Sequence, residues 1–439
     1  MSPTAAVTDS FSVQRRKMLE DFANVSMTAN SEKVSGLWSQ YHDMLTEARG
    51  VFCVDASKYG KPDLPGNRDF GGRGFLRSWM ASNRLLLIQN RDGAKECRYS
   101  APIFCDSNFV SYCEAFHSGR SLGPNEAAFR EAVVYLLPIA EGTNAFPYLV
   151  ENAENPDFEK VRSTLQAFAA FKLTSPAYFK KHGQFVTSDE DPNPNEIADG
   201  SLKIVHGQDF KILYARLKEH YLWSRIVLIK ATLLFFDGRL STVATLFYSL
   251  LKFLHDELAR FPQFEIYAAH RFFQLNSREP FFSPVQQNAR NLDQKIRSMA
   301  WDMAHWRSLF EMLAIGSSFV GATPFPIPHF LSFDRRFVRL TESCQLNGLI
   351  YAADGRRCEH IYSESLLRPV SELLAGPCCE FYTEEAMRDR QRRNLVDEVQ
   401  TEMLIQTEVD LTKQLNSTVN QILQTDSAGI KIGTSNGRH

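Results

Sequence analysis

Features that mark several common protein classes are missing from this sequence of 439 residues. None of its eight cysteines belongs to a Cys-x-x-Cys pair, which argues against a zinc knuckle. The formal net charge is only −2, so no overall positive field points to nucleic acid, and any such site depends on local positive patches. The N-terminus has no apolar signal-peptide core, and several cysteines lie inside apolar runs as expected of buried free thiols. Both features favour a reducing, cytoplasmic location.

Long uninterrupted hydrophobic runs are also missing. The most apolar region, residues 226–254, is broken by Lys230, by Asp237-Gly238-Arg239 and by Lys252. Neither half reaches the ~20 residues that a membrane-spanning helix needs, so we expect no membrane partner. Hydrophobic residues still make up 44% of the chain, which is enough for two or three domains or for one heavily inserted domain.

The stretch Ser100–Glu114 joins a strand pattern to a helix pattern. The apolar run Ile103–Cys105 ends in Asp106-Ser107-Asn108, and apolar residues then recur at helical spacing from Phe109. In a parallel sheet this point is the carboxyl edge of a strand, where ligands bind. Burial of Asp106 is costly unless its own helix or a metal ion satisfies it, so the residue is either an N-cap or a metal ligand.

A second apolar run, residues 330–333, ends in the same way at Asp334. A basic, helix-compatible stretch follows it, with Arg335, Arg336 and Arg339. Two runs that both end in Asp predict that Asp106 and Asp334 lie at the same edge of one sheet.

Three further acids lie on helical patterns. Asp302 is one turn from Met299 and from Trp306, at the margin of an apolar helix face. Glu257 follows an apolar helix, and Glu265 begins another.

Together these patterns resemble the PIN-domain family of metal-dependent nucleases. That family has a strand ending in an Asp-x-Asn-like triplet, a helix-borne Glu, a helix-borne Asp, and a last strand ending in Asp before a basic or aromatic residue. Asp106-Ser107-Asn108 and Ser332–Phe337 carry the resemblance. Asp302 takes the third place, and Glu257 or Glu265 takes that of the Glu, although the gaps between the acids are longer than in the family.

The resemblance implies a divalent-metal-dependent endoribonuclease that uses Mg²⁺ or Mn²⁺, with RNA favoured over DNA. Ions ~3.5–4 Å apart activate water and relieve charge on the phosphate, and they need several carboxylate oxygens. The implied catalytic residues are Asp106, Glu257, Asp302 and Asp334. The implied metal ligands are Asp106, Asp302, Asp334 and Glu265. The residues expected to contact substrate are Ser107, Asn108, Arg335, Arg336 and Arg339.

We therefore expect an α/β fold, with a PIN-like parallel sheet core, a large helical insertion, and helical N- and C-terminal extensions. The expected divisions are an N-terminal helical segment (1–50), a core (51–345) interrupted at about 121–245, a hairpin with a short helix (346–382), a long helix (383–424) and a disordered tail (425–439). The long helix is a candidate surface for a homo-oligomer or a protein partner.

Two other functions stay open. His220, the pair His255-Asp256 and Asp302 on successive helices resemble the HD-type metal phosphohydrolases, but this interpretation leaves both strand–Asp patterns unexplained. A non-catalytic helical scaffold or interaction protein is the second alternative. The segment Gly71–Gly74 lacks the Gly-Lys-Ser/Thr ending of a phosphate loop and is predicted to be a plain loop.

Overall fold

The computed structural model describes most of the chain, which divides into two compact units. The described residues are 17–18, 21–22, 31–45, 48–53, 66–81, 85–89, 94–96, 99–155, 157–186, 193–237, 242–287, 289–315, 325–351, 358–362, 376, 378–393 and 397–432. Unit 1 comprises Met1–Lys211 and Ser308–Ser365, and unit 2 comprises Ile212–Arg307 and Leu366–His439.

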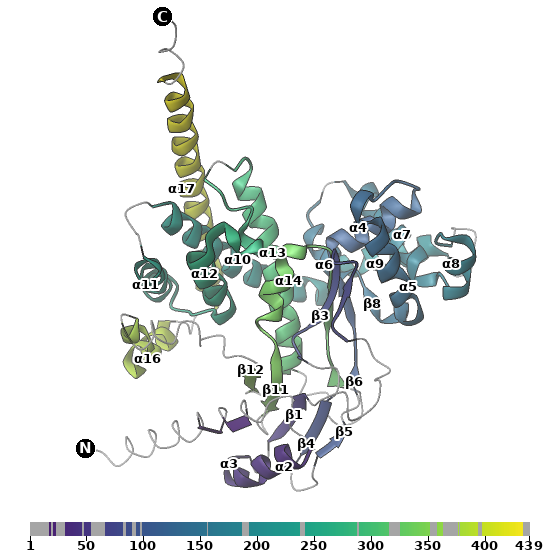
Figure 1. The fold of residues 1–439 in the computed structure, drawn as a ribbon, viewed down its shortest axis with the longest axis horizontal. Coiled ribbons are helices and arrows are strands. Elements are labelled where there is room, and N and C mark those ends of the chain that lie inside the picture. Colours follow the sequence, from purple (N-terminus) through teal and green to yellow (C-terminus); the bar gives the residue numbers. More distant parts are fainter. Residues whose placement is uncertain are drawn as a thin grey trace, which may run out of the picture. The chain divides into compact units, whose positions relative to one another are not determined.

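Unit 1 contains an antiparallel sheet with the strand order β12-β11-β1-β4-β5 (Figure 1). Every neighbouring pair in it is antiparallel. Its strands are β1 (Arg49–Cys53), β4 (Leu85–Gln89), β5 (Ala94–Glu96), β11 (Leu346–Tyr351) and β12 (Cys358–Tyr362).

Unit 1 also contains a mixed sheet with the order β2-β3-β10-β7-β8. Its strands β8, β7 and β10 are parallel, whereas β3 is antiparallel to both β10 and β2. The strands are β2 (Arg68–Phe70), β3 (Gly74–Ser78), β7 (Ile103–Cys105), β8 (Thr143–Asn144) and β10 (His329–Ser332). Two short strands that precede β7 and β10 also pair in parallel, β6 (Tyr99–Ser100) and β9 (Phe325–Pro326).

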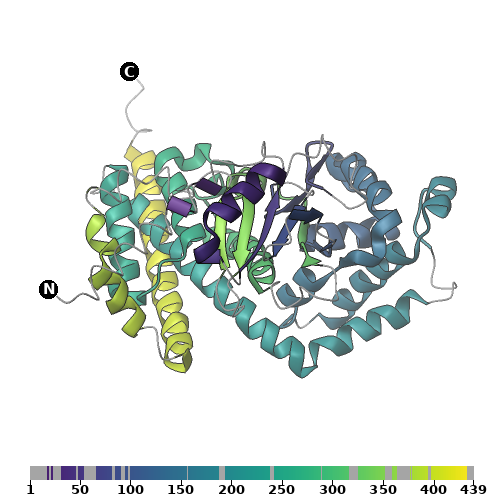
Figure 2. The same ribbon diagram turned by 90° about the horizontal axis from the view of Figure 1, so that it is seen from below.

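The helices between β7 and β10 in unit 1 gather at one side of the mixed sheet (Figures 1 and 2). Phe109 lies at the centre of their aromatic core, with its ring within 6.5 Å of the rings of Phe129, Phe168, Phe171 and Phe333. The helices of unit 1 are α2 (Ser31–Gln40), α3 (His42–Leu45), α4 (Ser107–His117), η2 (Gly123–Asn125), α5 (Glu126–Leu136), η3 (Leu137–Gly142), α6 (Phe146–Glu151), α7 (Phe158–Leu173), α8 (Pro176–His182), α9 (Pro194–Val205) and α14 (Arg335–Glu342).

A buried arginine fixes α14 against the mixed sheet. Arg77 on β3 is 5% exposed, and its Nη2 lies 2.6 Å from Asp69 Oδ1 and 2.7 Å from Glu342 Oε1 at the end of α14. A buried guanidinium needs such partners because an unpaired buried charge is very costly. The ion pair between Arg77 and Glu342 therefore holds α14, the helix after Asp334, against β3.

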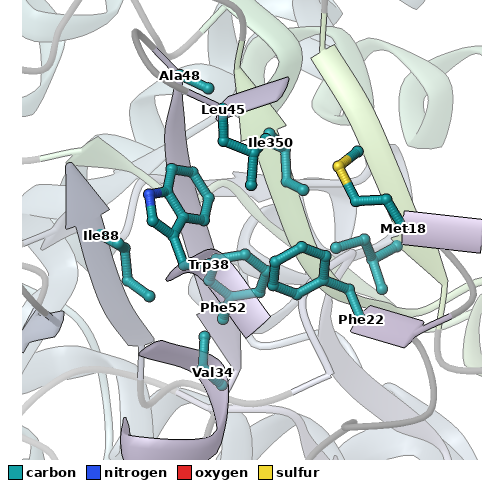
Figure 3. Close-up of a cluster of buried hydrophobic side chains, with 10 residues drawn as sticks. Met18, Phe22, Val34, Trp38, Leu45, Ala48, Phe52, Ile88 and Ile350 are labelled. Carbon is teal, nitrogen blue, oxygen red and sulfur yellow. The ribbon is translucent and has the colours of Figure 1, made fainter. Parts of the chain in front are cut away.

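The antiparallel sheet has its own apolar cluster (Figure 3). Trp38 from α2 meets the Phe52 ring edge-on at 6.1 Å, and Phe22 stacks on Phe52 at 5.1 Å. Gly50 and Gly348 leave room for the Phe52 ring, because a Cβ at either position would lie 2.3 or 2.7 Å from it. The buried members of the cluster are Met18, Phe22, Val34, Trp38, Leu45, Ala48, Phe52, Ile88, Ile350 and Ile361.

The described part of unit 2 consists of helices and the turns between them, without strands. Arg225 on α10 is 1% exposed, and its guanidinium pairs with Asp293 of α13 at 2.7 Å and with Glu408 of α17. The helices are α10 (Gln208–Phe236), α11 (Val243–Phe253), the π-helical turn η4 (Leu254–Leu258), α12 (Gln263–Leu275), η5 (Asn276–Arg278), η6 (Pro280–Phe282), α13 (Leu292–Ile315), η9 (Cys379–Tyr382), α16 (Glu384–Arg393) and α17 (Asp397–Ile432). Two of the boundaries between the units fall inside α10 and α13.

The combination of helices and β-sheets expected from the sequence is confirmed, but the expected parallel sheet core is wrong in its strand directions. Chain reversal at Gly71–Arg73 makes β2 and β3 an antiparallel hairpin, and β3 adds to β10 in the opposite direction. The antiparallel pair β11 and β12 forms a hairpin within the segment 346–382, where one was expected.

The C-terminal region differs from the expected long helix and disordered tail. Helices α16 and α17 lie where one helix was expected, and α17 continues to Ile432, well into the segment expected to be disordered. No proline interrupts residues 397–432, so the helical hydrogen bonds can continue through this polar segment. Within the described residues, no helix combines the length and apolarity needed to cross a membrane.

Two glycine-to-alanine substitutions in unit 1 are expected to have opposite effects. Gly348→Ala places a Cβ 2.7 Å from the Phe52 ring and 3.0 Å from the Val51 carbonyl oxygen, so it should lower the unfolding free energy by about 1–3 kcal/mol. Gly36→Ala lies in α2, where a Cβ meets nothing within 4 Å, and should raise it by roughly 0.5–1 kcal/mol. Urea unfolding measures both free energies. Equal effects of the two variants would contradict the close packing of Gly348 against Phe52.

Candidate functional site

Asp106 and Asp334 lie at the same edge of the mixed sheet. Strands β7 and β10 are parallel neighbours, with Cys105 paired with Leu331. The Asp106 N–H continues this ladder by donating to the Leu331 carbonyl oxygen at 2.9 Å. The carboxyl ends of the two strands thus deliver both acids to one place, which we call the carboxyl edge.

The Asp106 carboxylate is buried and surrounded by hydrogen-bond donors. It caps α4, because Oδ1 accepts from the Phe109 N–H at 2.8 Å. Oδ2 accepts from the Ser332 hydroxyl, from the Phe333 N–H at 3.2 Å and from Asn108 Nδ2 at 3.3 Å. Only 3% of Asp106 is exposed. The N-cap interpretation of Asp106 is therefore correct, and the same group also joins α4 to the segment after β10.

Burial raises the pKa of Asp106 from 3.8 to about 6. The hydrogen bonds from the Ser332 hydroxyl and from the Phe109 and Phe333 N–H groups lower the pKa, since they stabilise the ionised form. The cost of removing the charge from water exceeds their effect. The negative charge of Glu151 raises the pKa further.

Asp334 is held by the helix that follows it. Its side chain caps α14 by accepting from the Arg336 N–H at 2.9 Å, and the Arg336 guanidinium binds the same carboxylate, with Nε 2.8 Å from Oδ1. Arg336, which was expected to contact substrate, therefore forms an ion pair with Asp334. Arg335 and Arg339 are exposed on α14, and within the described residues neither forms an ion pair.

Glu151 is an acid of unit 1 that the sequence analysis missed. It ends α6, which begins two residues after β8, the strand parallel to β7. Its charge reaches Asp106, as the raised pKa of Asp106 records. In the sequence, only Thr143-Asn144 followed by a helix with Pro147 in its first turn could have indicated this strand–helix unit. A strand of two residues is too short to show the alternating pattern by which strands are recognised.

Arg73 also reaches the carboxyl edge, from the turn between β2 and β3. Phe75 of β3 pairs with Ser332 of β10, so the turn lies beside the end of β10. Arg73 Nη1 donates to Asn125 Oδ1 at 3.4 Å, and Asn125 Nδ2 donates to the Tyr112 hydroxyl at 2.7 Å. The segment predicted to be a plain loop is thus a tight turn, in which Gly71 and Gly72 adopt positive φ.

Tyr112 connects these groups. Burial raises the pKa of its hydroxyl, and the negative charges of Asp106 and Asp334 raise it further, whereas Arg73 lowers it. Its ring meets that of Phe333 edge-on at 5.3 Å. Tyr112 therefore lies within electrostatic reach of both acids and of the arginine.

A pocket of about 510 Å³ lies beside the carboxyl edge. Tyr112 and Asn125 line it and also belong to the hydrogen-bonded chain that starts at Arg73. Its remaining walls come from α4, α7, the end of α6 and the loops beside them. The lining residues used below are Ser107, Ser111, Ala115, Arg120, Lys160 and Thr164.

The helix-borne acids expected at the site belong to unit 2. Glu265 is 1% exposed and accepts from the Ser224 hydroxyl at 2.9 Å and from Arg307 Nη1 at 3.1 Å, so its carboxylate pairs within the helices. Glu257 is exposed in η4, and Asp302 is half-buried on α13.

The histidines of the HD-type interpretation also lie in unit 2. His255 Nδ1 is 3.2 Å from Arg390 Nη1, and burial together with the Arg393 and Arg390 charges lowers the pKa of His255. His220 is buried on α10.

The donor set at the carboxyl edge, as arranged, does not fit a two-metal centre. Both oxygens of Asp106 already accept hydrogen bonds, and Asp334 is bound by Arg336. In the described part of the chain, no group of three or more His, Cys, Asp or Glu side chains is placed to hold a metal ion. Of the expected ligands, unit 1 holds Asp106 and Asp334, and unit 2 holds Asp302 and Glu265.

No protein-family model matches the sequence, and comparisons with curated proteins and with solved structures give no match either. The resemblance to PIN domains therefore depends on the residues of this chain alone.

The raised pKa of Asp106 predicts a pH-dependent stability. The folded protein keeps the Asp106 proton up to about pH 6, whereas the unfolded chain releases it near pH 3.8. Unfolding thus releases a proton between these values, so the unfolding free energy should fall as pH rises from about 4 to 6, by about 3 kcal/mol. Asp106→Asn should remove this dependence. Urea unfolding at several pH values measures it.

Asp157→Asn is the matched control, because Asp157 caps α7 in the same way but is exposed. It should keep the pH dependence of the wild type. An unchanged pH dependence in Asp106→Asn would mean that Asp106 does not titrate as its burial requires.

Proposed function

We propose that unit 1 is a nuclease with a PIN-like core that cleaves phosphodiester bonds at the carboxyl edge, with RNA favoured over DNA. The observation that carries the proposal is the position of Asp106 and Asp334 after adjacent parallel strands. Ligands of α/β proteins bind outside the carboxyl ends of parallel strands.

The strand order supports the proposed core. Strands β8, β7 and β10 are parallel, and the connection from β7 to β8 runs through α4 and α5, as in the crossovers of α/β proteins. Asp106 follows the central strand of the three, and Asp334 follows its neighbour. Glu151 lies seven residues beyond the end of the third strand, at the end of α6, and its charge reaches Asp106.

Cations near the acids support a phosphate substrate. Arg73 reaches the edge from the β2–β3 turn, and Arg335 and Arg339 are exposed on the helix that Asp334 caps. Guanidinium groups bind phosphate oxygens through paired N–H donors. Their role in the proposal is to hold the phosphates of the nucleic-acid strand at the carboxyl edge.

The cofactor of the proposal, Mg²⁺ or Mn²⁺, comes from the resemblance. Such ions supply an activated water and relieve charge on the phosphate. Since the described side chains do not form a ready ligand set, we assign no ligand to Asp106 and none to Glu265, whose carboxylate is paired with Arg307. Asp106 acts here as the positioning residue that keeps β7, α4 and β10 together.

Substitution of either of the two less buried acids should slow cleavage strongly. Asp334→Asn removes the charge but keeps the N-cap of α14, and Glu151→Gln removes the charge at the end of α6 with little change in size, so both variants should fold. Each should lower the cleavage rate of single-stranded RNA by ~10²-fold or more. Gel assays with Mg²⁺, with Mn²⁺ and with chelator measure the rate and its dependence on metal.

Glu384→Gln is the control, because Glu384 lies exposed on α16 and pairs only with Arg388 among the described residues. It should cleave as the wild type does. Full activity of Asp334→Asn would mean that cleavage does not take place at the carboxyl edge. A wild-type protein that cleaves neither RNA nor DNA with either metal would favour the non-catalytic scaffold.

A histidine variant separates the HD-type alternative. His255→Gln removes a ring that contacts Arg390 and Phe381, and under our proposal it should leave metal-dependent cleavage unchanged. The same RNA assay tests it. Loss of cleavage in His255→Gln, with Asp334→Asn still active, would reverse the order of the two proposals.

A further inference from the structure

The pocket beside the carboxyl edge has no role in the chemistry proposed above. Its volume of about 510 Å³ lies within the ~300–1,000 Å³ of typical ligand sites. One wall is the face of α4 that carries Ser107, Ser111 and Ala115 at spacings of four residues. These side chains are small, whereas Phe109 and Cys113 on the opposite face are fully buried, so the hollow follows from the composition of α4.

The charged side chains that line the pocket carry a net positive charge, while the negative charges of Asp157 and Glu151 reach its lining residue Tyr148 from outside. Lys160 from α7 lines it, and within the described residues its ammonium group forms no ion pair. Arg120 and Glu114 also line it and neutralise each other in an ion pair. The charged side chains that line the pocket therefore sum to one positive charge, which lies on Lys160.

Hydroxyl groups supply hydrogen-bond donors in the same pocket. The Ser107 Oγ atom is buried and, among the described residues, has no hydrogen-bond partner. A buried polar atom without a partner is costly, and a bound ligand would remove that cost. Ser111 lies one turn further along α4 and is exposed. Two hydroxyls and an ammonium are the groups that bind phosphate oxygens.

We propose that this pocket binds one phosphate of a single-stranded nucleic acid, beside the nucleotide that reacts at the carboxyl edge. The inference rests on the proposed function, since Tyr112 and Asn125 belong to both the pocket and the edge. An unpaired strand can bend a nucleotide into a hollow between helices, whereas a duplex keeps its phosphates on a stiff helical path. The pocket thereby selects unpaired strands.

Binding measured without cleavage tests the pocket separately from the nuclease. Fluorescence anisotropy in chelator gives the affinity of labelled single-stranded RNA and of duplex RNA over a range of salt concentrations. Lys160→Ala should weaken single-strand binding and lower the slope of log K against log salt by about 0.7, the loss of one phosphate contact. Duplex binding should not change.

Two further variants make the comparison specific. Lys180→Ala removes the same charge from α8, outside the pocket, and should leave the slope unchanged. Ser111→Leu fills the pocket without changing charge and should weaken single-strand binding. If Lys180→Ala and Lys160→Ala have equal effects, or if Ser111→Leu binds as the wild type does, the pocket is not a phosphate site.

Oligonucleotides with a 5′-phosphate, a 3′-phosphate or neither distinguish the source of the phosphate. An effect of Lys160→Ala confined to one phosphorylated end assigns the pocket to a terminal phosphate, and an equal effect on all three assigns it to an internal phosphodiester. No effect on any of them overturns the inference. Pocket-dependent binding without cleavage in Mg²⁺ or Mn²⁺ would contradict only the nuclease, and cleavage with Lys160-independent binding would contradict only the pocket.

Discussion

The Asp106 carboxylate holds the carboxyl edge together. One oxygen accepts from the first turn of α4, and the other accepts from Ser332 and Phe333 at the end of β10. These bonds join segments that are far apart in sequence. They form at the cost of burying a charge, and the raised pKa of Asp106 shows that burial outweighs the hydrogen bonds. The positions of Asp334, Tyr112 and the pocket all depend on this junction.

A group that performs this structural task has little capacity left for a metal ion. The Asp106 oxygens face N–H and O–H donors, and Asp334 faces Arg336. The residues of the edge that remain for substrate are therefore at its rim, with Arg73 on one side and Lys160 in the neighbouring pocket. The acids of the carboxyl edge thus have a structural role, whereas the cations at its rim are the groups that would bind a nucleic-acid strand. Within unit 1, Glu151 on α6 adds a further negative charge that reaches Asp106.

The acids and arginines of unit 2 show why a sequence pattern misleads in helical regions. Glu265 pairs with Arg307, and Arg225 pairs with Asp293 and Glu408, all with one partner almost fully buried. Such pairs are costly to break, because removal of one partner leaves the other charged and buried. In the sequence, an acid of this kind next to an apolar helix face looks the same as a metal ligand. Only the partner, which lies on another helix, distinguishes the two.

The sequence by itself determined the local features of the site. An apolar run that ends in Asp and is followed by helical spacing specifies a strand, a cap and a helix at Asp106 and again at Asp334, because each feature depends on neighbours within a few residues. The hairpin of β11 and β12 was predictable for the same reason. Tertiary structure alone decided the rest: the antiparallel addition of β3 to β10, the two-residue strand that leads to Glu151, and the return of Arg73 to the edge. These depend on pairing between distant segments, and their energy comes from contacts that no local pattern records.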